Sequence, residues 1–465
     1  MKLPEITENG YFFQDNDQKE IEIFVGIEAY STSEFQGISG IYKHSLKDFI
    51  VKEITSSGKV LEMKENYPPQ PFLTKFDRFT TFNLVKSNKD TFKAIRDISR
   101  YLRVSPNLFH YAGLKDRSSI SVQKVSIKGD FVDQLKRMKL RDIFIRSITP
   151  TKKPVRLGGN RGNNFIIVIR NIKNKDNLKE NIEKLFKDLT SRGFPNYFGI
   201  QRFGQYRPNS HSVGRYILED DYEKAYNEFV TVVYSTESPR LQTIRRNIKK
   251  EPNLEKALEL LPTSLYYERS LIKHLIENPG EYKNAFETLQ TDLKNLLISA
   301  FQSFIFNKMI SLRVKRGFNL IKPVKGDAIS ILDEENGHVT KIKYVYGDLN
   351  GNYDKYLDKA LKLNRAAIVV PIIGYNSNLD EFPLMKTFFE EIIQQEAIDV
   401  KVFDNQYLYD FEFKGAYRSM IIKPQGLKII EFEDDDLFPG KKKLKFEVSL
   451  PKGTYATLLL REIMK

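Results

Sequence analysis

Short runs of alternating apolar and polar residues in the first half of the chain predict the strands of a partly buried sheet. Residues 48–54 alternate in this way, and residues 79–85 and 122–127 have a similar strand-like character. Phe165–Ile169 is a run of five apolar, mostly β-branched residues, which is typical of a strand in the interior of a sheet. The pattern therefore predicts a sheet with at least one fully covered strand.

Two segments have the apolar spacing of amphipathic helices. Asp90 and Thr91 can cap the first, and its predicted apolar face comprises Phe92, Ile95, Ile98 or Ser99, and Leu102. The second spans about residues 177–191, and Gly193 can end it in a left-handed conformation. Its apolar stripe comprises Leu178, Ile182, Leu185, Phe186 and Leu189. The spacing therefore predicts two helices, each with one apolar face.

The character of the chain changes between about residues 216 and 412. Charged, helical stretches come first, a mixed α/β stretch follows, and strand-like segments return near the C-terminus with a turn at Phe438–Gly440. We therefore predict an α/β (α+β) sheet domain that is built from both ends of the chain and interrupted by an insertion. The predicted parts are an N-terminal extension 1–36, a sheet domain 37–215, an insertion 216–412, and the C-terminal part of the sheet domain 413–465.

Composition narrows the range of functions. Lysine and arginine total 74 against 60 aspartates and glutamates, which gives a net charge of +14 and an estimated pI of about 9.3. This balance favours a polyanionic partner such as nucleic acid, although a lysine-rich proteome explains it about equally well. The lack of cysteine excludes thiolate metal sites and cysteine nucleophiles, and the five histidines are too dispersed for a local metal motif. Without a signal peptide or a long apolar run, we expect a cytoplasmic protein with no membrane segment.

The segment Gly113–Arg117 is the first candidate for chemistry. Phosphate loops, dinucleotide fingerprints, zinc-protease motifs and nucleophile elbows are all missing from the sequence. In this segment Asp116 lies between Lys115 and Arg117, and neighbouring positive charge favours an ionised carboxylate that can act as a nucleophile. A solvated turn is the common alternative for such a segment, and the residues alone leave both interpretations open.

Two further segments could bind nucleic acid. Residues 194–204 compress four aromatic side chains with Asn196, Gln201 and Arg202, and such rings can stack on an unstacked base while amides contact its edge. A loop anchored in the core by its aromatic rings is the alternative. Cations at residues 152–161, including Arg156, and at residues 245–250 would suit phosphate contacts, and ordinary solvated surface would explain them equally well.

Taken together, these segments resemble the TruD family of pseudouridine synthases. The resemblance extends over about residues 40–465, and the blocks occur in the order of the family. They are 48–53 with Lys43 upstream, 113–117 with Gln123 downstream, 156–165, 195–204, 299–307 and 450–462. Two residues depart from the family pattern: Ser119 stands where alanine is usual and Ser121 where threonine is usual, which concerns fine positioning and leaves the carboxylate in place.

The resemblance implies a pseudouridine synthase catalytic domain with a mixed, largely antiparallel sheet and a large inserted α/β domain. Asp116 would be the nucleophile, attacking either the sugar C1′ or the base of a uridine, and Lys43 would keep it charged. Phe198 would stack on the everted uracil, and Asn196 would help to position the site. Further contacts to RNA, or support for the site, would come from Lys115, Arg117, Arg156 and Arg202.

The implied reaction needs no cofactor and no metal. Its implied substrate is tRNA, usually at uridine 13. Modification of other tRNA positions or other RNAs stays open, and so does a non-catalytic RNA-binding or chaperone role. Retention of Asp116 together with Lys43, Asn196 and Phe198 argues against that last alternative.

Overall fold

Two compact units make up the protein. The computed structural model describes residues 5–7, 10–13, 18–72, 77–251, 253–333, 337–347 and 352–465. One unit comprises Thr32–Phe194 and Ile422–Lys465, and we call it the sheet unit. The other comprises Met1–Ser31 and Pro195–Ile421, and we call it the helical unit. The strands β10 (Phe194–Pro195) and β16 (Ile421–Ile422) lie where the chain passes between the units.

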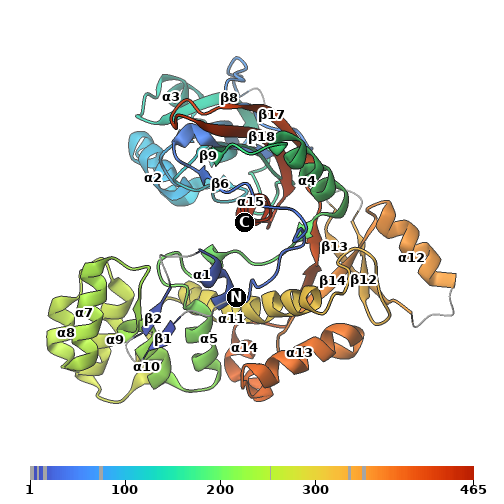
Figure 1. Cartoon of the computed structure of the whole chain (residues 1–465). Coiled ribbons are helices and arrows are strands. Elements are labelled where there is room, and N and C mark those ends of the chain that lie inside the picture. Colours follow the sequence, from blue (N-terminus) through green and yellow to red (C-terminus); the bar gives the residue numbers. More distant parts are fainter. Residues whose placement is uncertain are drawn as a thin grey trace. The chain divides into compact units, whose positions relative to one another are not determined.

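The sheet unit is built on a nine-stranded mixed sheet (Figure 1). Its main strand order is β17-β18-β9-β4-β7-β5-β8, with β3 paired to β9 and β6 paired to β7. Only the β4–β7 pair is parallel among the pairs in the described part of this sheet, so the expected mixed, largely antiparallel architecture is confirmed. The strands are β3 (Ile41–Tyr42), β4 (Phe49–Ile54), β5 (Phe79–Ser87), β6 (Phe109–Tyr111), β7 (Ile120–Lys128), β8 (Ile143–Thr151), β9 (Gly162–Lys173), β17 (Gln425–Asp434) and β18 (Lys441–Pro451).

Helices α2 (Thr91–Leu102) and α4 (Leu178–Arg192) cover the same face of this sheet. Ile95 and Ile98 of α2 share a buried core with Phe82 of β5, and the ring of Phe186 in α4 lies 5.5 Å from that of Phe446 in β18. Residues that pair directly on neighbouring strands point to the same face of a sheet, and so do residues two positions apart on one strand. Followed through β9, β4 and β7, these pairs place Phe446 of β18 and Phe82 of β5 on the same face. The unit also contains α3 (Val132–Arg137), α15 (Ala456–Met464) and the 3₁₀ turns η2 (Leu46–Asp48) and η3 (Pro106–Leu108).

The two helix predictions are confirmed, with one error in the apolar face. Asp90 caps α2 by accepting a hydrogen bond from the backbone N–H of Lys93 at 2.7 Å, and Gly193 follows α4 with a φ of +78°. All five residues of the predicted α4 stripe are buried. In α2, however, Phe92 is 54% exposed, because the buried stripe runs through Thr91, Ala94, Ile95, Ile98 and Ser99 and Phe92 lies beside it.

The helical unit is organised around α11 (Thr291–Lys315), a helix of 25 residues that is buried over most of its length. Two small sheets belong to this unit, one with the order β1-β2-β11 and one with the order β13-β12-β14-β15. Their strands are β1 (Glu5–Thr7), β2 (Gly10–Phe12), β11 (Val233–Tyr234), β12 (Ala328–Leu332), β13 (Val339–Val345), β14 (Ala366–Ile372) and β15 (Ala416–Ser419). The other helices are α1 (Gln18–Phe24), α5 (Ser210–Leu218), α6 (Tyr222–Tyr226), α7 (Pro239–Lys250), α8 (Leu254–Leu260), α9 (Tyr266–Glu277), α10 (Tyr282–Glu287), α12 (Asn352–Lys362), α13 (Pro383–Gln395) and α14 (Gln406–Asp410). Shorter turns are η4 (Ile200–Arg202), the π-turn η5 (Asn227–Thr231), η6 (Leu379–Glu381) and η7 (Val400–Asp404).

The unit boundaries differ from the predicted ones at 36, 215 and 412. The described part of the N-terminal segment up to Ser31 belongs to the helical unit, where β2 pairs in parallel with β11 and where Val25 and Ile27 are buried. The loop after Phe194 joins the same unit through contacts with α11, and β15 joins it by pairing with β14. These pairings link residues far apart in sequence, which a local composition pattern does not reveal.

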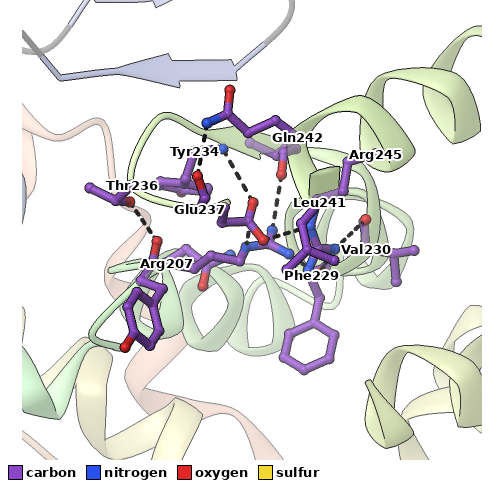
Figure 2. A network of polar contacts seen from close by, with 12 residues as sticks. Arg207, Phe229, Val230, Tyr234, Thr236, Glu237, Leu241, Gln242 and Arg245 are labelled. Atoms are coloured by element: carbon purple, nitrogen blue, oxygen red, sulfur yellow. Dashed lines mark hydrogen bonds and ion pairs between the residues drawn. The ribbon is translucent and has the colours of Figure 1, made fainter. Parts of the chain in front are cut away.

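Arg245, for which the sequence left a phosphate contact open, belongs to a buried polar network of the helical unit (Figure 2). Arg245 is 1% exposed and donates to the Glu237 carboxylate at 2.9 Å, the Glu268 carboxylate at 3.0 Å and the Val230 carbonyl at 2.6 Å. Arg207 lies 3.8 Å from the same Glu237 carboxylate. The guanidinium of Arg245 is thus committed to the interior of the helical unit and is not available to RNA.

Two features of other protein classes are missing from the described residues. None of the helices there combines the length and apolar composition that a transmembrane span requires. Histidines and carboxylates in the same ranges form no group of three that could hold a metal ion.

Candidate active site

Asp116 lies on the loop between β6 and β7 and presents its carboxylate to solvent. Its side chain is 72% exposed, and one carboxylate oxygen lies 3.5 Å from the Lys43 ammonium. Lys43 directly follows β3, its φ of +57° is in the left-handed region, and its ammonium lies 4.3 Å from the centre of the Phe49 ring. A left-handed backbone at a non-glycine residue costs free energy and is concentrated at functional sites. The sheet unit therefore brings together the two charged residues that the sequence singled out.

Buried side chains of β7 and α2 fix the main chain of this loop by hydrogen bonds. Gln123 of β7 donates its amide N–H to the carbonyl of Gly113 at 3.1 Å, and its oxygen accepts the Thr91 hydroxyl at 2.9 Å. That hydroxyl in turn accepts the backbone N–H of Lys115 at 2.9 Å. All these polar groups are buried except Gly113, which is half-buried, so each hydrogen bond satisfies a group that water does not reach.

Lys115, for which a contact to RNA or support for the site was expected, lies in a buried ion pair. Its ammonium is buried and donates to the Glu53 carboxylate of β4 at 3.1 Å, and the exposed fractions of these side chains are 4% and 2%. The other Glu53 oxygen accepts the backbone N–H of Lys124 at 3.0 Å. Lys115 and Arg117 flank Asp116 in the sequence but point to different environments, since Arg117 is exposed and donates to the Asn88 side chain at 3.3 Å.

Two side chains hold the carbonyl of Asp116 itself. The Lys86 ammonium donates to it at 2.9 Å, and the Ser119 hydroxyl donates to it at 3.0 Å. Ser119 is thus a departure from the family pattern that adds a hydrogen bond under Asp116, where alanine would supply none. Lys86 carried no signal in the sequence, because it lies just beyond the predicted strand 79–85 and a single lysine there is ordinarily a solvated residue.

The aromatic loop in the helical unit contains both anchoring rings and one accessible ring. Phe194, which immediately precedes the unit boundary, Tyr197 and Phe203 are buried, so for these three the core-packing interpretation is correct. Phe198 is only half-buried. Its backbone N–H donates to the Asn307 amide oxygen at 2.8 Å, and the Asn307 amide N–H donates to its carbonyl at 3.0 Å. The α11 helix therefore fixes the position from which the Phe198 ring projects.

Asn196 orients an arginine over the Phe198 ring. The Asn196 amide N–H donates to the Ser419 carbonyl at 2.8 Å, and its oxygen accepts a hydrogen bond from Arg418. The Arg418 guanidinium carbon lies 4.3 Å from the centre of the Phe198 ring, and that of Arg202 lies 5.7 Å from it. Both distances allow cation–π attraction. Arg418 was missed because it follows Asn196 by more than 200 residues and lies in no motif.

The structure thus groups the candidate residues by unit. Lys43 and Asp116 are together in the sheet unit, where Arg156 is exposed. Asn196, Phe198 and Arg202 are together in the helical unit. An exposed carboxylate beside an ammonium, carried on a fixed loop, can act as a nucleophile towards an electrophilic carbon.

Comparison with known proteins gives a consistent result. The family model described as "tRNA pseudouridine synthase D (TruD)" matches residues 24–463. A probable tRNA pseudouridine synthase D of Methanosarcina mazei is 31% identical over 454 residues, which are 96% of this chain and 98% of that protein. One of Pyrococcus abyssi is 31% identical over 433 residues, covering 93% of this chain and 98% of that protein. The crystal structure of a putative tRNA pseudouridine synthase D from M. mazei superposes with a TM-score of 0.78 at 31% identity and covers 96% of this chain and 98% of that one.

Proposed function

Because this chain belongs to the TruD family of tRNA pseudouridine synthases, we propose that Asp116 is the nucleophile with which it isomerises uridine to pseudouridine in tRNA. The observation that carries the proposal is the exposed Asp116 carboxylate 3.5 Å from the Lys43 ammonium, on a loop whose main chain is hydrogen-bonded from below. A carboxylate that is exposed and held on a fixed main chain can reach an electrophilic carbon and act as a nucleophile. We propose uridine 13 as the target and the cytoplasm, where tRNA is available, as the location.

In the proposed reaction Asp116 attacks the target nucleoside at C1′ or at the base. The glycosidic bond between C1′ and N1 breaks, the uracil rotates, and a new bond forms between C1′ and C5. The bond between the Asp116 carboxylate and the nucleoside breaks in turn, which regenerates the free carboxylate. The proton on C5 is lost and N1 gains one, so the product has the same atoms as the substrate. The chain supplies the nucleophile and the geometry, and the balance requires no oxidant or reductant.

The target base must leave its stack before its glycosidic bond can be reached. Eversion of a base costs a few kcal/mol, and stacking on an aromatic ring is worth roughly 1–3 kcal/mol, so one ring offsets much of the cost. We propose that Phe198 provides this ring. Support comes from its partial exposure and from the two hydrogen bonds by which Asn307 fixes its backbone.

Affinity for tRNA would come mainly from contacts between cations and phosphates. We propose that the exposed Arg117 and Arg156 contribute, together with the outer face of α2, where Lys93, Arg96 and Arg100 are all exposed. The N-terminus of α2 supports this location, because it is hydrogen-bonded to the Asp116 loop. Reversing the charges of Arg96 and Arg100 should weaken tRNA binding and reduce the slope of log Kobs against log [salt] by roughly one per lost contact. A slope equal to that of the wild type would exclude this face.

The decisive experiment compares the wild-type protein with Asp116→Asn. The wild type should form pseudouridine in tRNA that carries uridine at position 13 and none in tRNA that carries cytidine there, as mapped by mass spectrometry of nuclease fragments. Asp116→Asn should bind tRNA with nearly wild-type affinity and yield no detectable pseudouridine. Since the Asp116 side chain is exposed, the change should alter the free energy of unfolding by less than about 0.5 kcal/mol. Substantial turnover by the variant would exclude Asp116 as the nucleophile.

A further inference from the structure

Lys86 is a buried lysine on β5, and its ammonium hydrogen-bonds to the main chain beside Asp116. The residue is fully buried, which is rare for lysine. Its ammonium donates to the carbonyls of Lys89 at 2.6 Å, Lys115 at 3.1 Å and Asp116 at 2.9 Å. An ammonium has three N–H donors, so these three bonds use its whole capacity. Two of the three acceptors are the consecutive carbonyls at and before the proposed nucleophile.

The position of the Asp116 carboxylate depends on its main chain. The side chain is largely exposed, and among its contacts the Lys43 ammonium at 3.5 Å is the close charged partner. An exposed ion pair at this distance is worth little and restricts the carboxylate only weakly. Precision at a reacting group must then come from rigid support below it. The Lys86 and Ser119 hydrogen bonds to the Asp116 carbonyl supply this support.

The hydrogen bonds of Lys86 depend on its charge. A neutral amine has two N–H donors and a lone pair, so one of the three carbonyls would face a repulsive lone pair. Burial is the largest cause that lowers the pKa of the Lys86 ammonium, attraction to Asp116 and Asp90 opposes the shift, the positive charge of Lys115 adds to it, and the net pKa is about 8. Glu53, the other charged residue of this buried region, is paired with Lys115. The ammonium is therefore charged at neutral pH and loses its proton in a range in which enzymes can be assayed.

We propose that Lys86 is a positioning residue for Asp116: as an ammonium it ties the carbonyls of Lys115 and Asp116 to the sheet and so aims the exposed carboxylate. The proposal rests on the proposed nucleophilic role of Asp116. Lys86 contacts neither the carboxylate nor solvent, so it acts on the reaction through the main chain. It is distinct from Lys43, which contacts the carboxylate directly.

The test is the variant Lys86→Met, which keeps the length of the side chain and removes the donors. Single-turnover kinetics with a tRNA transcript should show the rate constant of the chemical step falling about 100-fold, the penalty typical of a displacement of about 1 Å at a reacting group. The tRNA concentration that gives half-maximal rate should change less than threefold, because Lys86 does not reach the surface. The measurements are made well below the melting temperature of the variant, so that the folded enzyme is compared.

A pH profile separates positioning from a purely structural role. In the wild type the rate constant should fall above about pH 8, as Lys86 loses its proton. In Lys86→Met this alkaline fall should be gone and the low rate should be flat between pH 7 and 9. Lys115→Met is the matched control, since it removes the buried ammonium of the Asp116 loop itself but leaves Lys86 on β5 in place. It should retain the alkaline fall, displaced to higher pH because the positive charge of Lys115 lowers the pKa of Lys86.

The outcomes are distinct. A rate constant within threefold of the wild type in Lys86→Met would overturn the proposal, and so would an alkaline fall that persists in this variant. Asp116→Asn is assayed in parallel. If Asp116→Asn is active, the proposed nucleophile fails; if it is inactive and Lys86→Met is fully active, only the positioning role fails.

Discussion

The buried pair of Lys115 and Glu53 allows a quantitative test of how the Asp116 loop is held. In Lys115→Met the alkyl chain is retained, while the Glu53 carboxylate stays buried with the backbone N–H of Lys124 as its remaining hydrogen-bond donor. Removing one partner of a buried ion pair typically costs about 3–5 kcal/mol, because an uncompensated charge is left in the interior. The sheet unit comprises residues 32–194 and 422–465, and for a unit of this size such a loss corresponds to a fall in melting temperature of roughly 6–20 °C.

Differential scanning calorimetry measures this change, with Arg117→Met as the matched control. Arg117 is two residues away on the same loop and exposed, so its replacement should change the free energy of unfolding by less than about 0.5 kcal/mol. The double variant Lys115→Met with Glu53→Gln should recover at least half of the lost stability. In the double variant neither residue of the pair leaves a buried charge, and replacing both partners of a buried pair is often close to neutral.

The same variants distinguish a structural Lys115 from one that binds RNA. If the ammonium stays with Glu53, Lys115→Met leaves the salt dependence of tRNA binding unchanged, whereas loss of a phosphate contact by Arg117→Met lowers the slope by roughly one. A Lys115→Met protein as stable as the control, with a shallower salt dependence, would refute the reasoning. It would mean that the ammonium leaves Glu53 and reaches the substrate.

Three further outcomes are expected. Arg245→Met should destabilise the helical unit by about 3–5 kcal/mol in urea unfolding, because it removes the partner that the Glu268 and Glu237 carboxylates share and leaves Glu237 with the more distant Arg207. Arg246→Met on the same helix should cost less than about 1 kcal/mol, and equal effects would exclude the buried network as the cause. Burial lowers the pKa of His211 from 6.5 to about 3, so neutral His211 stabilises the fold above pH 6.5 and this contribution is lost as the pH falls towards 3. The loss amounts to roughly 2–3 kcal/mol at pH 4.5, so the melting temperature of the wild type should fall more between pH 7 and 4.5 than that of His211→Phe, and parallel curves would contradict this. Phe198→Ala should lower turnover roughly 5- to 150-fold, the equivalent of one stacking contact, with a smaller effect on stability; simple unfolding of the variant would favour a packing role.

Elements that depend on local pattern could be predicted from the sequence. In α4 the apolar stripe, the length and the terminal Gly193 all agree, because a helix on a sheet is specified by its own residues. The error at Phe92 in α2 has a local cause as well. Two stripes one position apart both contain Ile95 and Ile98, and only packing against the sheet selects the stripe that begins at Thr91.

Elements that depend on distant partners could not be predicted. Residues 1–36 have no repeated apolar pattern that indicates an element, yet Gly10 of β2 pairs with Val233 of β11. The segment at 416–419 resembles the strands that follow it, yet it pairs with β14 of the insertion. Neither partner can be identified from residues near it in the chain, so the boundaries of the units were misplaced although the α/β class was correct.

The same distinction between local pattern and distant partners applies to the candidate site. The motif identifies Asp116, but it does not identify the residues of other strands that support Asp116. Glu53, Lys86 and Gln123 come from β4, β5 and β7, and the strand register places all three on one face of the sheet, because Val51 and Lys86 are both paired with Ser121. A slip of one residue in β5 would turn Lys86 to the opposite face and remove both of its bonds to the Asp116 loop. The buried apolar residues of these strands oppose such a slip, because it would turn Phe82 away from the core that it shares with Val125 and α2. The apolar pattern that builds the core therefore also fixes where the proposed nucleophile stands, and substitutions in β5 that weaken the register should lower the rate of the chemical step before they unfold the protein.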